Sequence, residues 1–228
     1  TFRYLGEQQT GSLRYEYLGN DQRTGADRAF GRFAHRGLIN DRLSLAVEYA
    51  EVSDQAYFDD LGSDLDRSAL TFLPRELRAV YNSPSAYTAS LRVSSFQVLD
   101  PTLQRRERPY RRLPQLRVTA TTPGRLLYTR AGIDARFANF DGDNVVEGQR
   151  FHLNPSLRSF VDRNGWFAGA RLDWRYTGYA LSGPLAGRPA NPTRSLPSIS
   201  AEGGLRFDRF TEGGSRQTLE PRLFYLYT

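Results

Sequence analysis

The residues of this 228-residue chain that most resemble a catalytic set are His152, Asn154 and Ser156, which alternate along one short segment. Hydrolases often combine a serine nucleophile with a histidine base and an asparagine or aspartate that orients the ring. Alternate residues of a strand share a face but stand about 6.6 Å apart, which is too far for a direct relay unless the side chains lean together. We therefore interpret the set as a chance combination, and the sequence predicts no catalytic residue and no enzyme.

Two acidic stretches are candidate metal ligands. Asp59 and Asp60 are adjacent, so in an extended chain their carboxylates point apart, and a solvated loop is the better interpretation. Asp141 to Asn144 resembles half of a calcium loop, but Val145 to Glu147 follow without further oxygen ligands at the required spacing. We expect a turn there. Because the chain also has no cysteine, the sequence predicts neither a metal site nor a cofactor.

The basic residues are all arginine, and they leave a formal charge of +6 and an isoelectric point near 9.8. A nucleic-acid-binding protein would gather this charge on one face or in one run. Here the arginines are spread along the chain between aspartates and glutamates, so we expect no nucleic-acid partner. The densest run, Gln104 to Arg112, could contact glycolipid phosphates or a partner loop, although such runs are commonly only solvated loops.

The elements that must position these residues are β-strands, because apolar and polar residues alternate through most of the chain. The clearest cases are residues 42–51 and 166–177, where the charged residues fall on one face only. Residues 28–36 and 68–82 alternate less cleanly, and no stretch of comparable length has a helical period. The same alternation predicts strands over 133–137, 151–158, 199–208 and 218–227.

The connections between these strands are of two kinds, and the two kinds take turns along the chain. An up-and-down barrel places short turns at one rim and long loops at the other, whereas a soluble Greek-key sandwich would not be expected to alternate strictly. By convention the short turns face the periplasm. The predicted short turns are 37–41, 82–84, 122–124, 164–165 and 213–214, and the long loops are 19–27, 53–66, 100–111, 141–148 and 179–194.

The composition is compatible with a membrane barrel and excludes a membrane helix. Mean hydropathy is −0.57, and no window approaches the roughly 18 consecutive apolar residues that a helical span requires. Aromatic residues make up 13% of the chain, which suits the aromatic girdles of a barrel. The chain has no signal segment at Thr1 and ends within an apparent strand, so we expect further strands on both sides.

Prolines within the predicted strands test the regularity of the sheet. Each removes a backbone donor from the ladder, so each should mark a strand start, a bulge or a weakly paired position. These prolines are Pro74, Pro114, Pro155, Pro197 and Pro221.

The polar face of these strands would line the lumen of the barrel. A charged, wet wall could dock a plug protein and tolerate the passage of a phosphorylated glycolipid. The simpler interpretation is cross-strand ion pairs that hold neighbouring strands in register, each contributing about 0 to 1 kcal/mol. The candidate lumen-lining residues are Glu48, Arg92, Arg117, Arg130, Asp134, Arg136, Arg158, Arg171, Asp173, Arg175, Glu202, Arg206, Asp208, Glu220 and Arg222.

Several stretches resemble the lipopolysaccharide-assembly outer-membrane family LptD. Phe2 to Leu5, followed by Leu13 through Leu18, is similar to early barrel strands of that family, and the resemblance extends over essentially the whole chain. The most specific stretch runs from Gln217 to Tyr227. The family-motif residues are Tyr57, Phe58, Asp59, Leu61 and Gly62 after Val52-Ser53-Asp54; Leu113, Pro114, Gln115 and Leu116 after Arg112; and Gln217, Thr218, Leu219, Glu220, Pro221 and Arg222.

The resemblance implies an all-β, antiparallel up-and-down transmembrane barrel of about 26 strands, of which residues 1–228 would supply about 10 or 11. It also implies a periplasmic jellyroll domain, a lateral opening between the first and last strands, and family cysteines, none of which we expect in this segment. The implied partners are lipopolysaccharide, an LptE-like lipoprotein plug, periplasmic lipopolysaccharide-bridge components, outer-membrane lipid and the barrel-assembly machinery.

Two alternatives stay open at the level of sequence. A diffusion porin or nutrient transporter shares the barrel physics but lacks the family motifs. A soluble β-rich binding module would need both faces of its sheet covered by protein.

Overall fold

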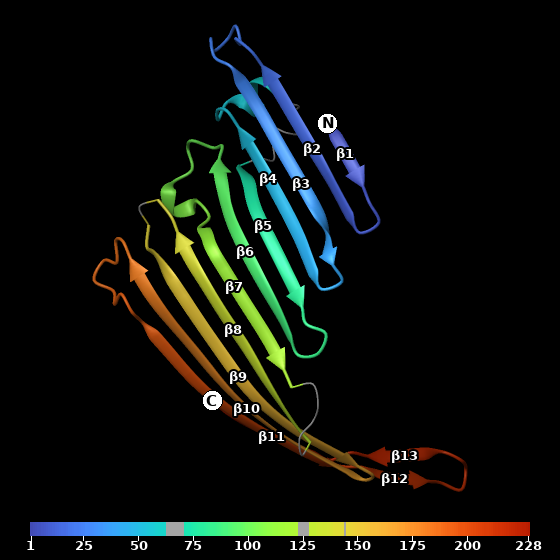
Figure 1. Ribbon diagram of the computed structural model, residues 1–228. Coiled ribbons are helices and arrows are strands. Elements are labelled where there is room, and N and C mark those ends of the chain that lie inside the picture. The colour runs from blue at the N-terminus through green and yellow to red at the C-terminus, as the bar shows by residue number, and fades with distance from the viewer. Residues whose placement is uncertain (63–70, 123–127, 144) are drawn as a thin grey trace.

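The alternating segments form a single antiparallel sheet. The computed structural model describes residues 1–62, 71–122, 128–143 and 145–228, and within them 12 strands follow one another in chain order as one curved layer (Figure 1). The strands are β1 (Phe2–Leu5), β2 (Gln9–Leu18), β3 (Arg28–Asn40), β4 (Leu43–Val52), β5 (Phe72–Asn82), β6 (Tyr87–Val98), β7 (Arg111–Thr121), β8 (Thr129–Asp141), β9 (Glu147–Arg163), β10 (Trp166–Ser182), β11 (Thr193–Leu205) and β14 (Arg222–Tyr227).

This architecture confirms the predicted fold class, an antiparallel meander typical of a barrel segment. The sheet is open, because β1 and β14 are its two edges and do not pair with each other. It has more strands than the predicted 10 or 11, since Phe2–Leu5 forms a short edge strand of its own. Turn residues 123–124 and loop residues 63–66, to which the prediction also applied, lie outside the described residues.

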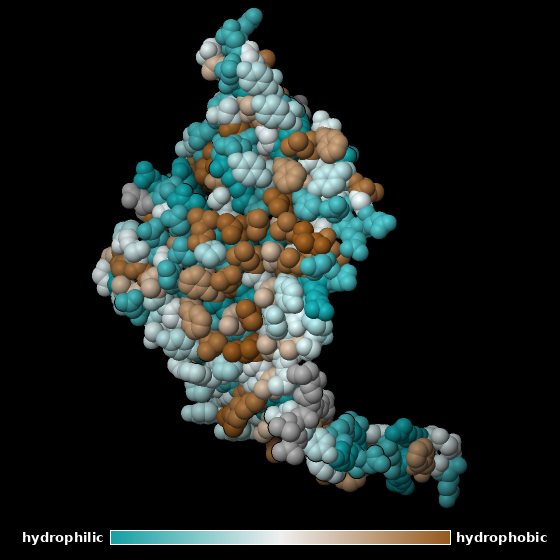
Figure 2. All heavy atoms as spheres, in the orientation of Figure 1, coloured by the Kyte–Doolittle hydropathy of each residue, from teal (hydrophilic) through white to brown (hydrophobic). Residues whose placement is uncertain are grey.

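One face of the sheet is apolar, and we call it the apolar face. Side chains on neighbouring strands share a face when they are directly opposite, as Leu157, Leu172 and Ile199 are across β9, β10 and β11. These side chains are 47%, 47% and 44% exposed, because no described element covers them. Figure 2 shows this face, where apolar side chains form a band across the middle strands with hydrophilic residues above and below. A soluble module would cover such a face with a second layer.

Aromatic side chains lie near both ends of the apolar face. Tyr81 and Tyr87 meet at the short-turn end with ring centroids 5.8 Å apart, and Trp166 follows the turn between β9 and β10. Tyr17 and Tyr49 lie near the long-loop end and are 59% and 41% exposed. This distribution is typical of the girdles that flank a bilayer-facing band.

The two kinds of connection lie at opposite ends of the sheet. The short turns gather at one end and the long loops at the other (Figure 1). The turn between β9 and β10 is the two-residue Asn164-Gly165 that the sequence predicts. Gly165 has a φ of +89°, a conformation that glycine adopts without a steric penalty.

The prolines interrupt the ladder where the sequence predicts. The register shifts across Pro114, and the pairing of β9 with β10 skips Pro155. Pro197 lies on β11 beyond the part that pairs with β14, and Pro221 separates β13 from β14. Pro74 is close to the start of β5. Each proline therefore occupies a position where the loss of a backbone donor costs little.

Beyond the short-turn end, β12 (Phe207–Phe210) and β13 (Arg216–Leu219) form a separate hairpin, whose turn includes the predicted Gly213-Gly214. The hairpin projects past the turn between β9 and β10 (Figure 1). Arg206 holds its base, since its guanidinium donates to both carboxylate oxygens of Asp162 at 2.7 and 3.2 Å and lies 5.2 Å from the centre of the Phe167 ring.

The main buried cluster lies at the long-loop end, where the short helix α1 (Tyr57–Leu61) packs against β3 and β4. Phe30 and Val52 are directly opposite each other, and Phe58 meets Phe30 edge-on at 5.3 Å. A single 3₁₀ turn, η1 (Arg105–Glu107), lies in the loop between β6 and β7. Among the described residues, no helix is long and apolar enough to cross a membrane.

Candidate functional site

The second face of the sheet holds most of the charged residues of the strands, and we call it the polar face. Directly opposite residues of neighbouring strands share a face, so the face of each charged residue follows from the strand register. Glu48 on β4, for example, is on the same face as Ala34 on β3. The predicted lumen-lining residues on this face are Glu48, Arg92, Arg117, Arg130, Asp134, Arg136, Arg158, Arg171, Asp173, Arg175, Glu202 and Arg222.

The other predicted residues lie outside the 12-stranded sheet. Asp208 belongs to β12, where Arg216 donates to both its oxygens at 3.1 and 2.7 Å. Arg206 and Glu220 occupy the gaps between β11 and β12 and between β13 and β14. These three residues therefore do not belong to the polar face.

Ion pairs on the polar face join both neighbouring strands and alternate residues of one strand. Asp134 accepts from Arg117 across β7 and β8 and from Arg136 on its own strand, at 2.8 Å each. Arg92 reaches Glu76 at 2.5 Å across β5 and β6. The geometry matches the register-holding interpretation, in which each exposed pair contributes about 0 to 1 kcal/mol.

The polar face also has arginines in excess of its carboxylates. Within the described ranges, several of these arginines have no ion pair or side-chain hydrogen bond: Arg130, Arg150, Arg158, Arg175 and Arg194. They lie on β8, β9, β10 and β11. Unpaired guanidiniums on one surface attract anions, because each presents a permanently charged fork of donors.

A hollow of about 1070 Å³ lies over β1 to β5. Small side chains form part of its floor, including Ser12, Ala34 and Ala46, and Arg36 and Glu48 are among the charged residues around it. The polar face is therefore recessed here, and it offers both charge signs to a docked group.

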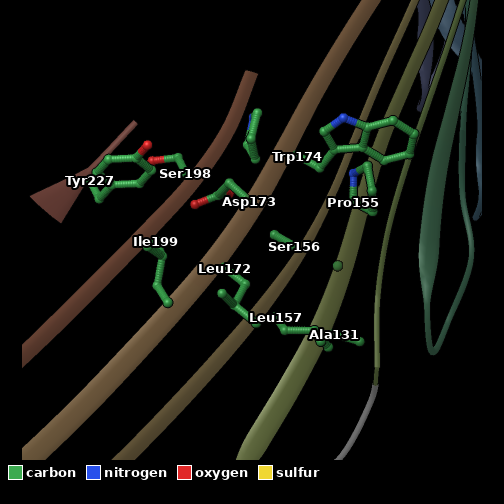
Figure 3. Close-up of a pocket in the computed structure, with 12 residues that line it drawn as sticks. Ala131, Pro155, Ser156, Leu157, Leu172, Asp173, Trp174, Ser198, Ile199 and Tyr227 are labelled. Atoms are coloured by element: carbon green, nitrogen blue, oxygen red, sulfur yellow. The ribbon is translucent and has the colours of Figure 1, made fainter. Parts of the chain in front are cut away.

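A second hollow is an apolar groove of about 570 Å³ over β8 to β11 and β14. Figure 3 shows Leu157, Leu172 and Ile199 along it, with Trp174 at one end and Tyr227 at the edge strand. The Trp174 indole N–H donates to Ser195 Oγ at 2.8 Å, which satisfies the ring's single polar atom. The groove suits an apolar chain.

At the long-loop end, Arg28 organises a cluster with Asp21, Asp54 and Asp60, which we call the Arg28 cluster. Arg28 is only 2% exposed and donates to both oxygens of Asp54 at 3.0 and 2.7 Å. Its remaining terminal nitrogen donates to Asp21 at 3.1 Å and to Asp60 at 2.9 Å. The guanidinium also lies 5.5 Å from the centre of the Tyr57 ring. The cluster therefore ties two long loops and α1 to the start of β3.

The stretch from Val52 to Gly62, which contains the first family motif, contributes to this cluster and to the core beside it. Asp54 and Asp60 bind Arg28, whereas Tyr57 and Phe58 are buried in the core. The Tyr57 hydroxyl donates to Glu16 at 3.1 Å. The motif therefore helps to hold the two long loops against the start of β3, and we call this arrangement the loop closure. The length and composition of the motif do not indicate this role.

Electrostatics favour the ionised form of the cluster. Burial raises the pKa of Asp54, but hydrogen bonds from Arg28 and Ser53 lower it by more, so its pKa falls below the usual value. The backbone N–H of Arg23 and the Arg28 guanidinium lower the pKa of Asp21.

We expect the loop closure to open in acid. Because the folded-state pKa values of Asp21 and Asp54 lie below their ordinary 3.8, their stabilisation is present above that pH and is lost as pH falls through the lower folded values. Spin labels at exposed Gln22 and Asp59 of the full-length protein in bilayers should give one narrow distance distribution at pH 7, which broadens as the pH is lowered stepwise below 3.8. An unchanged distribution would contradict this prediction.

The candidate catalytic and metal-ligating residues have other partners. His152, Asn154 and Ser156 share the polar face, but His152 Nδ1 bonds Thr177 Oγ1 at 2.8 Å and no hydrogen bond joins the set in the described residues. Asp141 and Asp143 both pair with Arg111, at 2.7 and 2.9 Å, and Asn144 lies outside the described residues. No group of described histidines, aspartates or glutamates has the geometry of a metal site.

The sequence analysis did not predict that two arginines of the polar face would lie directly opposite each other, although their distance from a turn indicated it. Arg158 and Arg171 lie directly opposite each other because they are equally distant from the Asn164-Gly165 turn. Counting outward from a two-residue turn gives such pairs. Arg28 had no comparable signal, since its carboxylate partners come from separate loops.

A single-layer meander with one apolar face and one charged face defines the chain as a segment of an up-and-down β-barrel. Residues 26–228 match the family model LptD, described as LPS transport system D. The chain belongs to this family.

Named relatives extend the match to the whole chain. The LPS-assembly protein LptD of an Azoarcus species is 37% identical over 235 residues, which cover 99% of this chain and 29% of that protein. The same protein of Alcanivorax borkumensis is 36% identical over 230 residues, covering 97% of this chain and 30% of the relative. This chain thus spans less than a third of the length of these relatives.

Proposed function

We propose that this chain is part of the wall of a bacterial outer-membrane barrel, and that the whole protein assembles lipopolysaccharide in the outer membrane. The observation that supports this most is the one-sided sheet in a chain that matches the LPS transport family over residues 26–228. In this proposal the apolar face meets lipid hydrocarbon and the polar face meets a water-filled lumen.

The polar face would act by shape, charge and partner docking, without covalent chemistry. Its recess over β1 to β5 would accommodate part of an LptE-like lipoprotein plug, because small floor residues leave room and both charge signs are present. Lipopolysaccharide would arrive from periplasmic bridge components. The barrel-assembly machinery would insert the protein, as for other barrels with a lipid-facing band.

A depletion strain tests the proposal. Cells depleted of their own family member should recover surface lipopolysaccharide when the full-length protein containing this segment is expressed. The readout is lipopolysaccharide on intact cells, compared with cells that carry an empty vector. Equal surface lipopolysaccharide with and without the protein would reject the proposed function.

Ion conductance of the reconstituted protein distinguishes the proposed function from that of a diffusion porin. The full-length protein reconstituted with its plug should conduct ions poorly, because the plug fills the lumen. Steady conductance that no plug protein blocks would favour a diffusion porin instead.

A further inference from the structure

Three arginines stand in one row across the polar face, and we call Arg130, Arg158 and Arg171 the arginine row. Arg130 is directly opposite Arg158 across β8 and β9, and Arg158 is directly opposite Arg171 across β9 and β10. Directly opposite residues have Cβ atoms about 4.5 to 5.5 Å apart, and like charges in such pairs destabilise a sheet. The side chains are exposed, so packing does not explain the row.

The neighbouring carboxylates are already engaged. Asp173 accepts from Arg171 at 2.5 and 2.9 Å, and Asp134 is shared by Arg117 and Arg136. Glu202 bonds Arg222. Among the described residues Arg130 and Arg158 therefore keep two uncompensated positive charges, and the sequence of 123–127, Pro-Gly-Arg-Leu-Leu, contains no acid.

Small residues flank Asp173 next to the row, so their side chains project little above the sheet. Gly132 is directly opposite Ser156, which is directly opposite Asp173, followed by Ser198 on β11. A Cβ added to Gly132 would lie 3.0 Å from Ser156 Oγ, so even one methyl group would crowd this floor. A ligand with polar substituents can thus approach the guanidiniums from the side of the serines.

We propose that the arginine row binds a phosphomonoester of the glycolipid that passes along the polar face. A phosphomonoester has a charge near −2 and three acceptor oxygens, which match two free guanidiniums beside a third that Asp173 holds in place. The inference rests on the proposed function, because it names the part of lipopolysaccharide that this segment contacts. Polar serine hydroxyls next to the row would face the attached sugar.

A photoreactive p-benzoylphenylalanine at Ser156 of the full-length protein, purified with its plug, tests the site. We expect crosslinks to phosphorylated lipopolysaccharide, and a fall of about tenfold either with chemically dephosphorylated lipopolysaccharide or in R130Q/R158Q, since two charge-assisted bonds are lost. The matched double variant R163Q/R209Q removes the same charge outside the polar face and should stay within about twofold of the parent, because surface charges away from a site contribute little.

The competing outcomes are distinct. Equal yields with intact and dephosphorylated lipopolysaccharide, or crosslinks to a protein partner instead, would overturn the inference. Equal competition by glucosamine 1-phosphate would reject the glycolipid as the source. If the parent protein restores surface lipopolysaccharide but crosslinks independently of phosphate, the inference fails alone. If it neither restores nor crosslinks lipopolysaccharide, the proposed function fails too.

Discussion

Replacing Arg28 by alanine is expected to open the long-loop end of the sheet. The guanidinium is almost fully buried, and its removal leaves Asp21 and Asp54 without their cation. Asp60 keeps only its ion pair with the exposed Arg23. Breaking a buried ion pair by removing one partner costs about 3 to 5 kcal/mol. Hydrogen exchange of the full-length protein in bilayers should therefore accelerate by about two to four orders of magnitude in residues 19–30 and 53–62.

Two further variants show whether burial and the fork geometry cause this effect. Arg23 also pairs with Asp60, at 2.6 Å, but its side chain is 73% exposed, so R23A should cost at most about 1 kcal/mol. R28K keeps the charge but loses the two-pronged bond to Asp54, and it should fall between the two alanine variants. Similar exchange in R23A and R28A would show that the cluster does not hold the loops.

Local pattern predicted most of the fold, because strand periodicity and turn chemistry are properties of neighbouring residues. The alternation at residues 42–51 and 166–177 corresponds to β4 and β10, and Asn164-Gly165 forms the predicted turn. Pro221 indicated weak pairing. It did not indicate that β12 and β13 would separate from the sheet, since that depends on Arg206 reaching Asp162 on β9.

The candidate site was less predictable, because its contacts join residues that are distant in the chain. Face assignments on β7 to β10 followed from alternation, but the partners of each arginine depend on register. The Arg28 cluster joins Asp21 to Asp60, and its helix α1 was predicted as a solvated loop. Such closures depend on tertiary packing that overrides local preference.

The second large effect is expected from placing a charge on the apolar face, and adjacent residues of β9 provide a matched pair. Leu157 is on the apolar face, directly opposite Leu172, whereas Ser156 is on the polar face, directly opposite Asp173. An arginine on the lipid-facing side near the bilayer midplane costs about 2 to 4 kcal/mol, but one facing water costs little. L157R should therefore lower the unfolding free energy of the full-length barrel in bilayers by this amount.

S156R should leave the unfolding free energy within about 1 kcal/mol of the parent, because its guanidinium stays in water. Urea titration of the bilayer-inserted protein, followed by the loss of the folded band on unheated gels, measures both variants. Because the two positions are adjacent on the same strand, the difference between their unfolding free energies reports the effect of the face alone. If L157R and S156R lose the same stability, then the side chains on the two faces of β9 do not meet hydrocarbon and water as proposed.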